Sequence, residues 1–316
     1  MPLTDNVPII PPFKTDSERP LWSVMVPTYN CANYLRFTLE SILAQDPGPE
    51  VMQIEVVDDC STKDDPEAVV QEIGRGRVQF FRKSNNEGAI ANFNTCVQRS
   101  RGHLIHILHG DDLVKPGFYH RLGQPLLADE AIGAAFCRQE YINEQGDRQL
   151  ITRCHQEQSG VMPDALSVLA VTNRIQPPAI VVRRHVYETL GGYNARLFHS
   201  ADWEMWVRIA ARYPIWFEAD PLAAYRVHAQ SDTSKLFRTG ANIQERRLCI
   251  DICRHYFPSA SAGRLYRKAL GYSALYAAKT ASRFLTAGHW QIALIQLREA
   301  ALCLLKLYQP TRSPLS

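Results

Sequence analysis

The chain has 316 residues, 46% of them hydrophobic and 21% charged, so it is long enough to bury a complete α/β core and to carry a smaller C-terminal part. Its net charge of +3 is too small to indicate a nucleic-acid partner, because such partners require a strongly basic face. The 8 cysteines lack the spacing of a disulfide framework or a zinc site, so we expect reduced thiols, with Cys249 and Cys253 as buried structural residues.

Residues 1–20 are rich in proline, which disfavours both helices and central strands, so we expect an extended or poorly ordered leader. This stretch lacks the basic and apolar regions of a signal peptide. No apolar run in the chain approaches the roughly 20 residues that span a bilayer. We therefore expect a cytoplasmic protein.

From Trp22 onward, short apolar runs alternate with longer amphipathic stretches, as in βαβ units around a buried parallel sheet. Strands are predicted at 22–27, 54–57, 78–81, 104–108, 132–136 and 179–182. Helices are predicted at about 33–45, 66–73, 89–99, 115–127 and 202–212. We expect loops from about 137 to 160 and an almost wholly helical chain beyond about 240.

Three of the predicted strands end in side chains suited to ligand binding. Tyr29 follows the first strand, Asp59 the second, and Asp111 and Asp112 follow the strand that ends at residue 108. Because ligands of open α/β sheets bind outside the carboxyl ends of the strands, we expect these residues to share one crevice. Carboxylates there could hold Mg²⁺ or Mn²⁺, and the ring of Tyr29 could stack on a nucleoside base.

Each of these signals also has a structural explanation when it is taken alone. An Asp–Asp step after a strand is typical of solvated turns and helix N-caps, and the same holds for Asp58 with Asp59 and for Asp202. A single histidine such as His228 is more often a satisfied surface or core residue than a ligand. The functional interpretation depends on several such turns ending neighbouring strands.

A series of segments resembles, in order, the successive motifs of family-2 glycosyltransferases over about residues 22–232. These segments are 26–30 (VPTYN), 56–62 (VVDDCST), 85–88 (NNEG) with Asn94, 109–112 (HGDD), 191–193 (GGY), 202–208 (DWEMWVR) and 225–228 (YRVH). The resemblance implies a GT-A fold, a nucleotide-sugar donor, and inversion at the anomeric carbon by direct displacement.

The resemblance also implies roles for single residues. Tyr29 and Asp59 would contact the nucleobase, and Pro27 and Thr28 would shape the base pocket. The full set of nucleotide-binding residues implied in this way is Pro27, Thr28, Tyr29, Asp59, Asn86, Gly88, Asn94 and Asp111.

The same resemblance implies the metal ligands and the catalytic base. Asp111 and Asp112 would serve the ribose and a diphosphate bound to Mn²⁺ or Mg²⁺, and His228 would ligate the metal or contact phosphate. Asp202 matches the general base that removes the proton from the acceptor hydroxyl. Two positions depart from the family pattern: His109 replaces the first acid of the common Asp-Xaa-Asp triplet, and Ala201 stands where Glu often precedes the base.

The C-terminal stretch alternates basic and apolar residues, and two interpretations remain. Such residues could lie on an anionic membrane surface, or they could be the solvated outer faces of packed helices. Interruption by Gly263, Gly271 and Gly288 favours packing. The residues concerned are Arg264, Arg267, Lys268, Lys279 and Arg283 with Leu265, Tyr266, Leu270, Tyr276 and Phe284.

We therefore predict a Rossmann-like, mostly parallel GT-A sheet flanked by helices, with a leader over 1–20, a catalytic domain over 21–238 and a helical extension over 239–316. The expected function is transfer of a hexose, from a UDP-sugar in our expectation, to a saccharide or lipid-linked acceptor in bacterial surface polysaccharide or glycolipid synthesis. The site of action would be the cytoplasm or the inner face of the membrane.

Two alternatives stay open at this point. A nucleotidyltransferase would also carry acidic metal ligands, but it should show a Gly-rich, basic phosphate loop where this chain has 28–31 (TYNC). A non-catalytic sugar-binding or nucleotide-binding protein on the same fold is the other alternative. The joint presence of Asp59, Asp112 and Asp202 argues against it.

Overall fold

The computed structural model describes residues 6–13, 19–228 and 232–308. The chain divides into two compact units. The first consists of Met1–Pro163, Ile175–Ala195 and Tyr213–Val227, and the second of Asp164–Arg174, Arg196–Arg212 and His228–Ser316. The second unit thus joins the predicted helical extension with two internal segments of the predicted catalytic domain and with the end of that domain, from His228 onward.

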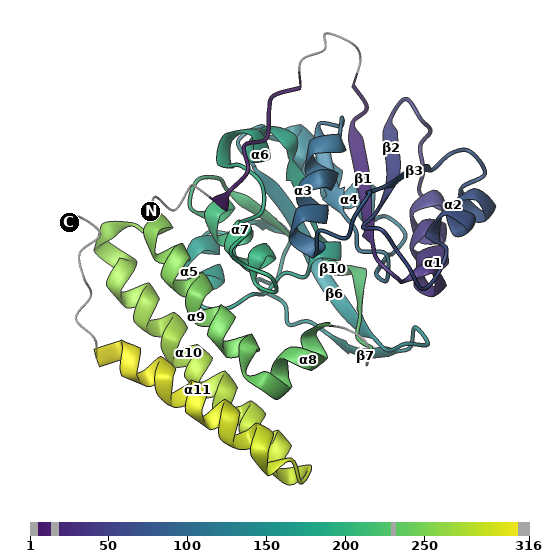
Figure 1. Ribbon diagram of the computed structural model, residues 1–316. Coiled ribbons are helices and arrows are strands. Elements are labelled where there is room, and N and C mark those ends of the chain that lie inside the picture. Colours follow the sequence, from purple (N-terminus) through teal and green to yellow (C-terminus); the bar gives the residue numbers. More distant parts are fainter. Residues whose placement is uncertain (1–5, 14–18, 229–231, 309–316) are drawn as a thin grey trace. The chain divides into compact units, whose positions relative to one another are not determined.

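The first unit is an α/β sheet structure (Figure 1). Its strands are β1 (Trp22–Thr28), β2 (Met52–Asp58), β3 (Gln79–Arg82), β4 (Leu104–Ile107), β5 (Leu113–Val114), β6 (Ala134–Ile142), β7 (Arg148–Ile151), β8 (Gly160–Val161), β9 (Ile180–Arg183) and β10 (Ile215–Arg226). Its helices are α1 (Ala32–Leu43), α2 (Pro66–Gly74), α3 (Ala89–Arg99), α4 (Phe118–Ala128), α6 (Arg184–Leu190) and the 3-10 turn η2 (Pro177–Ala179).

The strands are ordered β3-β2-β1-β4-β9-β6-β10-β5, with β7 beside β6 and β8 beside β10. β1 runs parallel to β2 and β4, and β2 runs parallel to β3. Strand β9 is antiparallel to both β4 and β6, so β6 and its parallel neighbour β10 run in the same direction as β1. The carboxyl ends of β1, β2, β4, β6 and β10 therefore lie at one edge of the sheet.

Burial on both faces explains why the central strands are almost continuously apolar. Every residue of β1 and of β2 is buried. On one face, α1 inserts Leu35, Leu39 and Ile42, which recur at helical spacing, into the main apolar cluster of the sheet. Helix α3 packs against β1, β2 and β4.

The predicted strands and helices of the first unit are confirmed to within a few residues, except in its second half. The expectation of loops from about 137 to 160 was wrong, because β6 continues to Ile142 and β7 follows. The long strand β10 was not predicted. Its register with β6 shifts on both sides of Pro221, since proline cannot donate to the ladder, and this interruption hides the strand in the sequence.

The described part of the N-terminal leader forms neither helix nor strand from Pro8 to Phe13 and packs on the rest of the first unit. The carbonyls of Asn6 and Pro8 accept hydrogen bonds from Ala195 N (2.9 Å) and Gly192 N (2.8 Å). Ile10 is fully buried. The leader, predicted to be extended or poorly ordered, is thus ordered by contacts at these residues, and residues 1–5 and 14–18 lie outside the described part of the chain.

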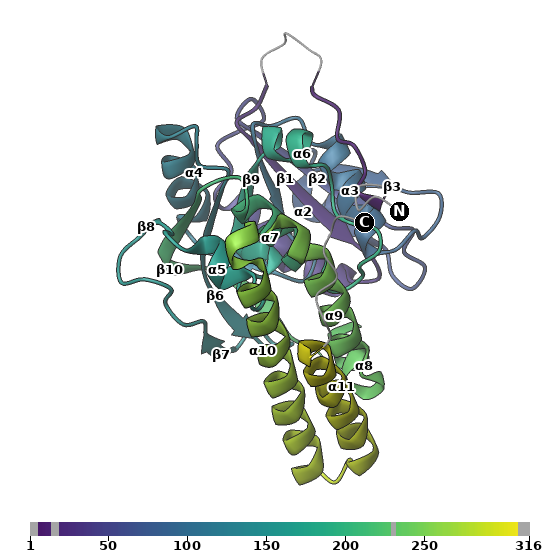
Figure 2. The same ribbon diagram turned by 90° about the vertical axis from the view of Figure 1, so that its left-hand side faces the viewer.

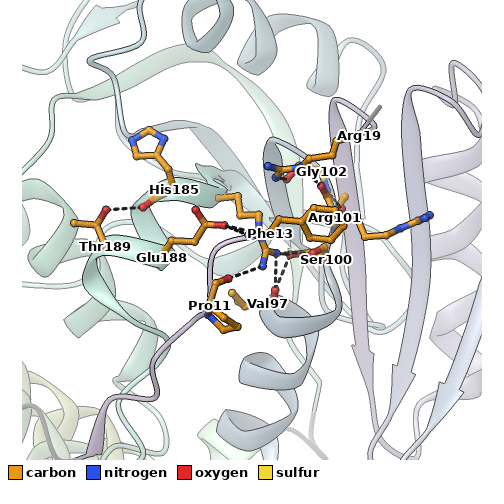
Figure 3. Close-up of polar contacts among 12 residues, drawn as sticks. Pro11, Phe13, Arg19, Val97, Ser100, Arg101, Gly102, His185, Glu188 and Thr189 are labelled. Carbon is orange, nitrogen blue, oxygen red and sulfur yellow. Dashed lines mark hydrogen bonds and ion pairs between the residues drawn. The ribbon is translucent and has the colours of Figure 1, made fainter. Parts of the chain in front are cut away.

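A buried arginine holds this leader in place, and its partners Pro11, Val97, Ser100 and Glu188 are labelled in Figure 3. Arg184, at the start of α6, donates to the carbonyl of Pro11 (3.3 Å), to the carbonyl of Val97 (3.1 Å) and to Ser100 Oγ (2.7 Å). Its Nε donates to Glu188 at 2.8 Å, and the same carboxylate accepts from the N–H of Phe13 at 3.3 Å. The leader therefore covers the guanidinium group of Arg184, which is paired with Glu188 and donates to acceptors in three further residues.

The second unit is helical. Its elements are α5 (Ala165–Leu169), α7 (Ala201–Ala210), α8 (Asp232–Thr239), α9 (Ala241–Cys253), the 3-10 turn η3 (Arg254–Tyr256), α10 (Ser259–Thr286) and α11 (Trp290–Tyr308). Helices α10 and α11 form a hairpin and lie side by side in both views (Figures 1 and 2). Among the described helices, none combines the length and hydrophobicity that a membrane crossing needs.

Small residues let the helices of the second unit pack closely. Ile243 of α9 packs with Ala274 and Ala277 of α10 and with Ala300 and Cys303 of α11. The thiols of Cys249 and Cys253 are buried 3.8 Å apart, which confirms their prediction as structural cysteines. Leu265, Tyr266 and Leu270 are buried as well, so the apolar residues at the start of α10 serve packing.

We expect Arg184→Ala to lower the free energy of unfolding by about 3 kcal/mol, because it removes a buried charge and leaves its acceptors without a donor. Thr189→Ala is the matched control in the same helix: its exposed hydroxyl bonds only to the carbonyl of His185, and the change should stay within about 0.5 kcal/mol. Urea denaturation monitored by circular dichroism measures both. Equal stability of the two variants would contradict the role of Arg184 in holding the leader.

Candidate active site

The strand ends predicted to converge do meet at the carboxyl edge of the sheet. The carbonyl of Thr28, the last residue of β1, accepts a hydrogen bond from Asp59 N at 3.0 Å. On the other side, the carbonyl of Pro27 accepts from Gly110 N at 3.1 Å. Tyr29, Asp59 and residues 109–112 therefore leave the sheet beside one another, and the shared crevice follows from the parallel pairing of β1 with β2 and β4.

Tyr29 is held at the rim of this edge and is 46% exposed. The next residue, Asn30, has a positive φ of 51°, which its short polar side chain tolerates. Its Oδ1 accepts from the N–H groups of Thr62 and Lys63, both at 2.9 Å. The turn thus leaves an aromatic face open to a ligand.

Asp59 is buried, and its carboxylate is engaged by the loop before α3. It accepts from Glu87 N (3.1 Å) and Gly88 N (2.8 Å) and pairs with Lys83 Nζ at 2.9 Å. Burial lowers the pKa of Lys83, but its bonds to Glu87 and Asp59 outweigh burial and raise it. Lys83 was not singled out in the sequence, since a lysine after a short strand carries no signal of its own.

The remaining predicted nucleotide-binding residues surround the start of α3. Asn86 Oδ1 accepts from Gly88 N at 3.1 Å, and Gly88 caps the helix at a φ of 88°, where a side chain would be strained. Asn94 donates to the carbonyl of Tyr193 (3.0 Å) and accepts from its N–H (2.7 Å). These contacts join two of the motifs, and the nucleotide-binding roles of Asn86, Gly88 and Asn94 remain predictions.

His109, Asp111 and Asp112 form a candidate metal site, with one ligand atom of each lying within 4.8 Å of the others. Asp112 is fully buried, and its Oδ1 accepts from Arg226 N at 2.8 Å. Its Oδ2 lies 3.8 Å from His109 Nδ1. Among the described residues, neither this Oδ2 nor His109 Nε2 has a hydrogen-bond partner. Buried polar atoms without partners fit a divalent cation, which accepts carboxylate and imidazole ligands.

The electrostatics of the cluster point the same way. Burial raises the pKa of Asp112 well above its ordinary value, and the charge of Asp111 raises it further. Burial lowers the pKa of His109, which keeps the imidazole neutral and able to ligate a metal. A bound cation would favour the ionised carboxylates that burial disfavours. His109, which departs from the family triplet, is therefore itself part of the cluster.

Arg226 is a site residue for which the sequence offered no assigned role. Its Nε donates to the carbonyl of Asp111 at 2.8 Å, and its Nη1 donates to the carbonyls of Asn143 (2.9 Å) and Glu144 (3.0 Å). The guanidinium also lies 4.8 Å from the centre of the Tyr34 ring. Arg226 lies in the YRVH motif, but its contact with the acidic turn depends on β10, which was not predicted.

Asp202 and His228 belong to the second unit. Ser200 occupies the N-cap of α7, so the N-cap explanation of Asp202 does not hold. Asp202 Oδ1 accepts from Trp203 N (2.7 Å) and Oδ2 from Asn173 Nδ2 (2.8 Å). Burial raises the pKa of Asp202 to about 6. His228 is half-buried, and a shared site of either residue with the acidic cluster remains a prediction.

Solved structures with this arrangement of sheet and helices are GT-A glycosyltransferases. A structure of Staphylococcus aureus TarS residues 1–349 in complex with UDP-GlcNAc is similar with a TM-score of 0.65 and 16% identity, over 88% of this chain and 81% of that one. The mannosyltransferase PcManGT of Pyrobaculum calidifontis, in complex with GDP-Man and Mn²⁺, is similar with a TM-score of 0.56 and 20% identity, over 95% and 90%. These likenesses show the fold.

Sequence comparison identifies the family. The family described as glycosyl transferase family 2 matches residues 23–191, more than half of the chain, and the protein belongs to that family. An uncharacterized protein of Mycobacterium tuberculosis is 28% identical over 240 residues, which cover 72% of this chain and 74% of the relative. An uncharacterized glycosyltransferase of Rickettsia typhi is 23% identical over 223 residues, covering 70% and 69%. The protein is a glycosyltransferase, which decides against both alternatives considered above.

We expect Asp112→Asn and His109→Ala each to weaken Mn²⁺ binding by about tenfold or more, because each removes a predicted ligand from the cluster. Electron paramagnetic resonance of free Mn²⁺ in a titration of the protein measures this directly. Glu50→Gln, at an exposed carboxylate away from the site, is the control and should bind as the wild type does. Unchanged affinity of Asp112→Asn would remove Asp112 from the metal site.

Proposed function

We propose that this glycosyltransferase moves a hexose from a nucleoside diphosphate sugar to an acceptor hydroxyl with inversion at the anomeric carbon, using Mn²⁺ or Mg²⁺. The observation that supports it best is the partly buried cluster of His109, Asp111 and Asp112, in which Asp112 Oδ2 and His109 Nε2 have no hydrogen-bond partner among the described residues. It lies at the same sheet edge as Tyr29 and Asp59, which suit a base and its ring N–H groups.

Sugar transfer from a nucleoside diphosphate requires that the leaving diphosphate be stabilised. A divalent cation held at this cluster would offset the negative charge that builds up on the diphosphate as its bond to the sugar breaks. The residues that would hold it are Asp111, Asp112 and His109, with His228 as a further candidate. Arg226 keeps Asp111 and Asp112 in place through the hydrogen bonds described above.

The acceptor must lose a proton as it attacks, and we assign this step to Asp202. Its carboxylate is oriented by Trp203 N and Asn173. A pKa of about 6, raised by burial, leaves it ionised near neutral pH while making it a stronger base than an exposed aspartate. Direct displacement with such a base on the opposite side of the sugar inverts the anomeric carbon.

The nucleotide and the acceptor are part of the proposal. We propose a UDP-sugar donor and a saccharide or lipid-linked hydroxyl acceptor, in the synthesis of a bacterial surface polysaccharide or glycolipid. TarS has been solved with UDP-GlcNAc and PcManGT with GDP-Man and Mn²⁺, so relatives in fold differ in the base they bind. Chondroitin synthase of Pasteurella multocida, 25% identical over 60% of this chain and 19% of that enzyme, supports a polysaccharide product.

We expect UDP with Mn²⁺ to raise the melting temperature of the protein, because a ligand that binds only the folded state stabilises it. UDP without metal should give a smaller shift, and GDP, dTDP and CDP with metal should give less than UDP. A thermal-shift panel of the four nucleotides, with and without Mn²⁺, measures this. A shift by none of them would oppose a nucleotide-sugar donor, and a larger shift by GDP would replace UDP in the proposal.

We also propose that the α10–α11 hairpin contacts an anionic membrane surface. Helix α10 carries basic but no acidic residues, and α11 has a single acidic residue, Glu299, which is buried against Arg247 at 2.6 Å. A second copy of the chain would therefore meet like charge, whereas anionic lipid headgroups complement it. An exposed apolar stripe runs along α11 at helical spacing: Trp290, Leu294, Leu297, Leu304, Leu305 and Tyr308.

We expect the protein to sediment with vesicles that contain phosphatidylglycerol and not with pure phosphatidylcholine vesicles. The double change Lys268→Glu with Lys279→Glu should abolish binding, and Trp290→Ala should weaken it, because they remove charge and apolar contact respectively. Leu127→Ala, at an exposed apolar residue of the first unit, is the control. Dimers in light scattering without vesicle binding would instead assign the stripe to a second copy.

A further inference from the structure

A carboxylate from α9 binds the backbone that leads into α7, the helix that carries Asp202. Glu245 Oε1 accepts hydrogen bonds from three successive backbone N–H groups, those of Phe198 (2.6 Å), His199 (2.5 Å) and Ser200 (2.8 Å). Ser200 is the N-cap residue of α7, but its own side chain makes no capping bond. The free N–H groups at a helix start need an acceptor, and a negative charge is favoured there. Of the three N–H groups that Glu245 binds, that of Ser200 stands at this helix start, and those of Phe198 and His199 lie just before it.

The residue next to it, Arg246, holds the other side of the same region. Its guanidinium lies 4.7 Å from the centre of the Trp203 ring, and it donates to Thr172 Oγ1 at 3.2 Å. Trp203 follows Asp202 in α7, and Thr172 precedes Asn173, whose side chain bonds to the Asp202 carboxylate. Two neighbouring residues of α9 thus contact the chain before Asp202, the residue after it, and the segment that carries its hydrogen-bond partner.

We propose that Glu245 is a positioning residue for Asp202, and that helix α9 is therefore part of the catalytic apparatus. This inference rests on the proposed role of Asp202 as the base. Because three N–H groups share one carboxylate oxygen, the start of α7 is fixed relative to α9. Asp202, two residues after Ser200, is fixed with it. The C-terminal helices then serve catalysis in addition to any contact with a membrane.

Glu245 also acts on Asp202 through its charge. The charged groups on the elements around Asp202 are His199 before α7, Glu204 and Arg208 within α7, Arg174 after α5, and Glu245 and Arg246 of α9. Glu204 and Arg208 pair with each other at 2.9 Å. Burial is the main cause of the raised pKa of Asp202; the charge of His199 lowers this pKa and that of Glu245 raises it. Glu245→Gln keeps an acceptor oxygen and removes the charge, so it should lower the pKa of Asp202.

The first test is a carbon-13 NMR titration of aspartate carboxyl groups over about pH 4 to 8. Asp202→Asn identifies the Asp202 signal by its loss, and the wild-type midpoint should lie near 6. In Glu245→Gln the midpoint should move to lower pH, whereas Glu50→Gln should leave it unchanged. An unchanged midpoint in Glu245→Gln overturns the electrostatic part of the inference without any need for a known donor.

The second test is turnover, measured as release of nucleoside diphosphate from UDP-glucose, UDP-GlcNAc and GDP-mannose with Mn²⁺. Asp202→Asn should lose about 10²-fold to 10⁴-fold in kcat. Glu245→Ala should lose about tenfold in kcat with an unchanged donor KM, because a displaced base slows only the chemical step, and Glu245→Gln should retain most of the activity. Thermal melts show whether each variant is folded. If Glu245→Ala is unfolded, the NMR titration of Glu245→Gln is the test of the inference.

The two failures are distinguishable. Wild-type turnover of Asp202→Asn would refute the proposed base. Loss of turnover in Asp202→Asn, together with wild-type kcat in Glu245→Ala and an unmoved titration in Glu245→Gln, would refute only the positioning role. If none of the three donors is turned over, the NMR titration is the only test of the role of Glu245.

Discussion

The candidate site depends on the burial of one carboxylate, that of Asp112. A buried charge is tolerated only when it is paired or neutralised, and here one oxygen is satisfied by the N–H of Arg226 while the other faces His109 without a hydrogen bond. The turn after β4 and the end of β10 must meet for this to happen. They do, across 114 positions of sequence. The oxygen without a hydrogen bond makes the turn suited to a divalent cation, so one carboxylate serves the fold through Oδ1 and the candidate metal site through Oδ2.

The rest of the first unit keeps that turn in shape. The Phe93 ring stacks on His109 with ring centres 4.8 Å apart and meets Tyr193 edge-on at 5.6 Å. Tyr193 is bound by Asn94, and the preceding Gly192 donates to the leader at Pro8. A Cβ at Gly192 would come within 2.3 Å of Asn94 Oδ1, so only glycine allows this approach. The N-terminal leader is thereby connected, through packed side chains, to the candidate metal site.

In the second unit, the cost of burying a carboxylate applies to Asp202. Asp202 is buried near the start of α7, and its surroundings supply hydrogen bonds to both oxygens. Glu245 of α9 binds the backbone that leads into this helix, so a segment from the middle of the chain is organised by a helix near the end of it. This explains why Asp164–Arg174 and Arg196–Arg212 belong to one compact unit with the C-terminal helices.

The sequence by itself determined the parallel sheet and the residues at its strand ends, because a buried strand appears in the sequence as a short apolar run that ends at a polar turn. Tyr29, Asp59, Asp111 and Asp112 were found in this way. Only the tertiary structure decided the partners of those residues: Lys83 for Asp59, Arg226 for Asp112, and Glu245 for the helix of Asp202. Such pairings join distant segments and are selected by packing and by the cost of an unpaired buried charge. Local periodicity does not encode either of them, and β10, whose pairing shifts at Pro221, shows that the pattern can conceal even a strand of 12 residues.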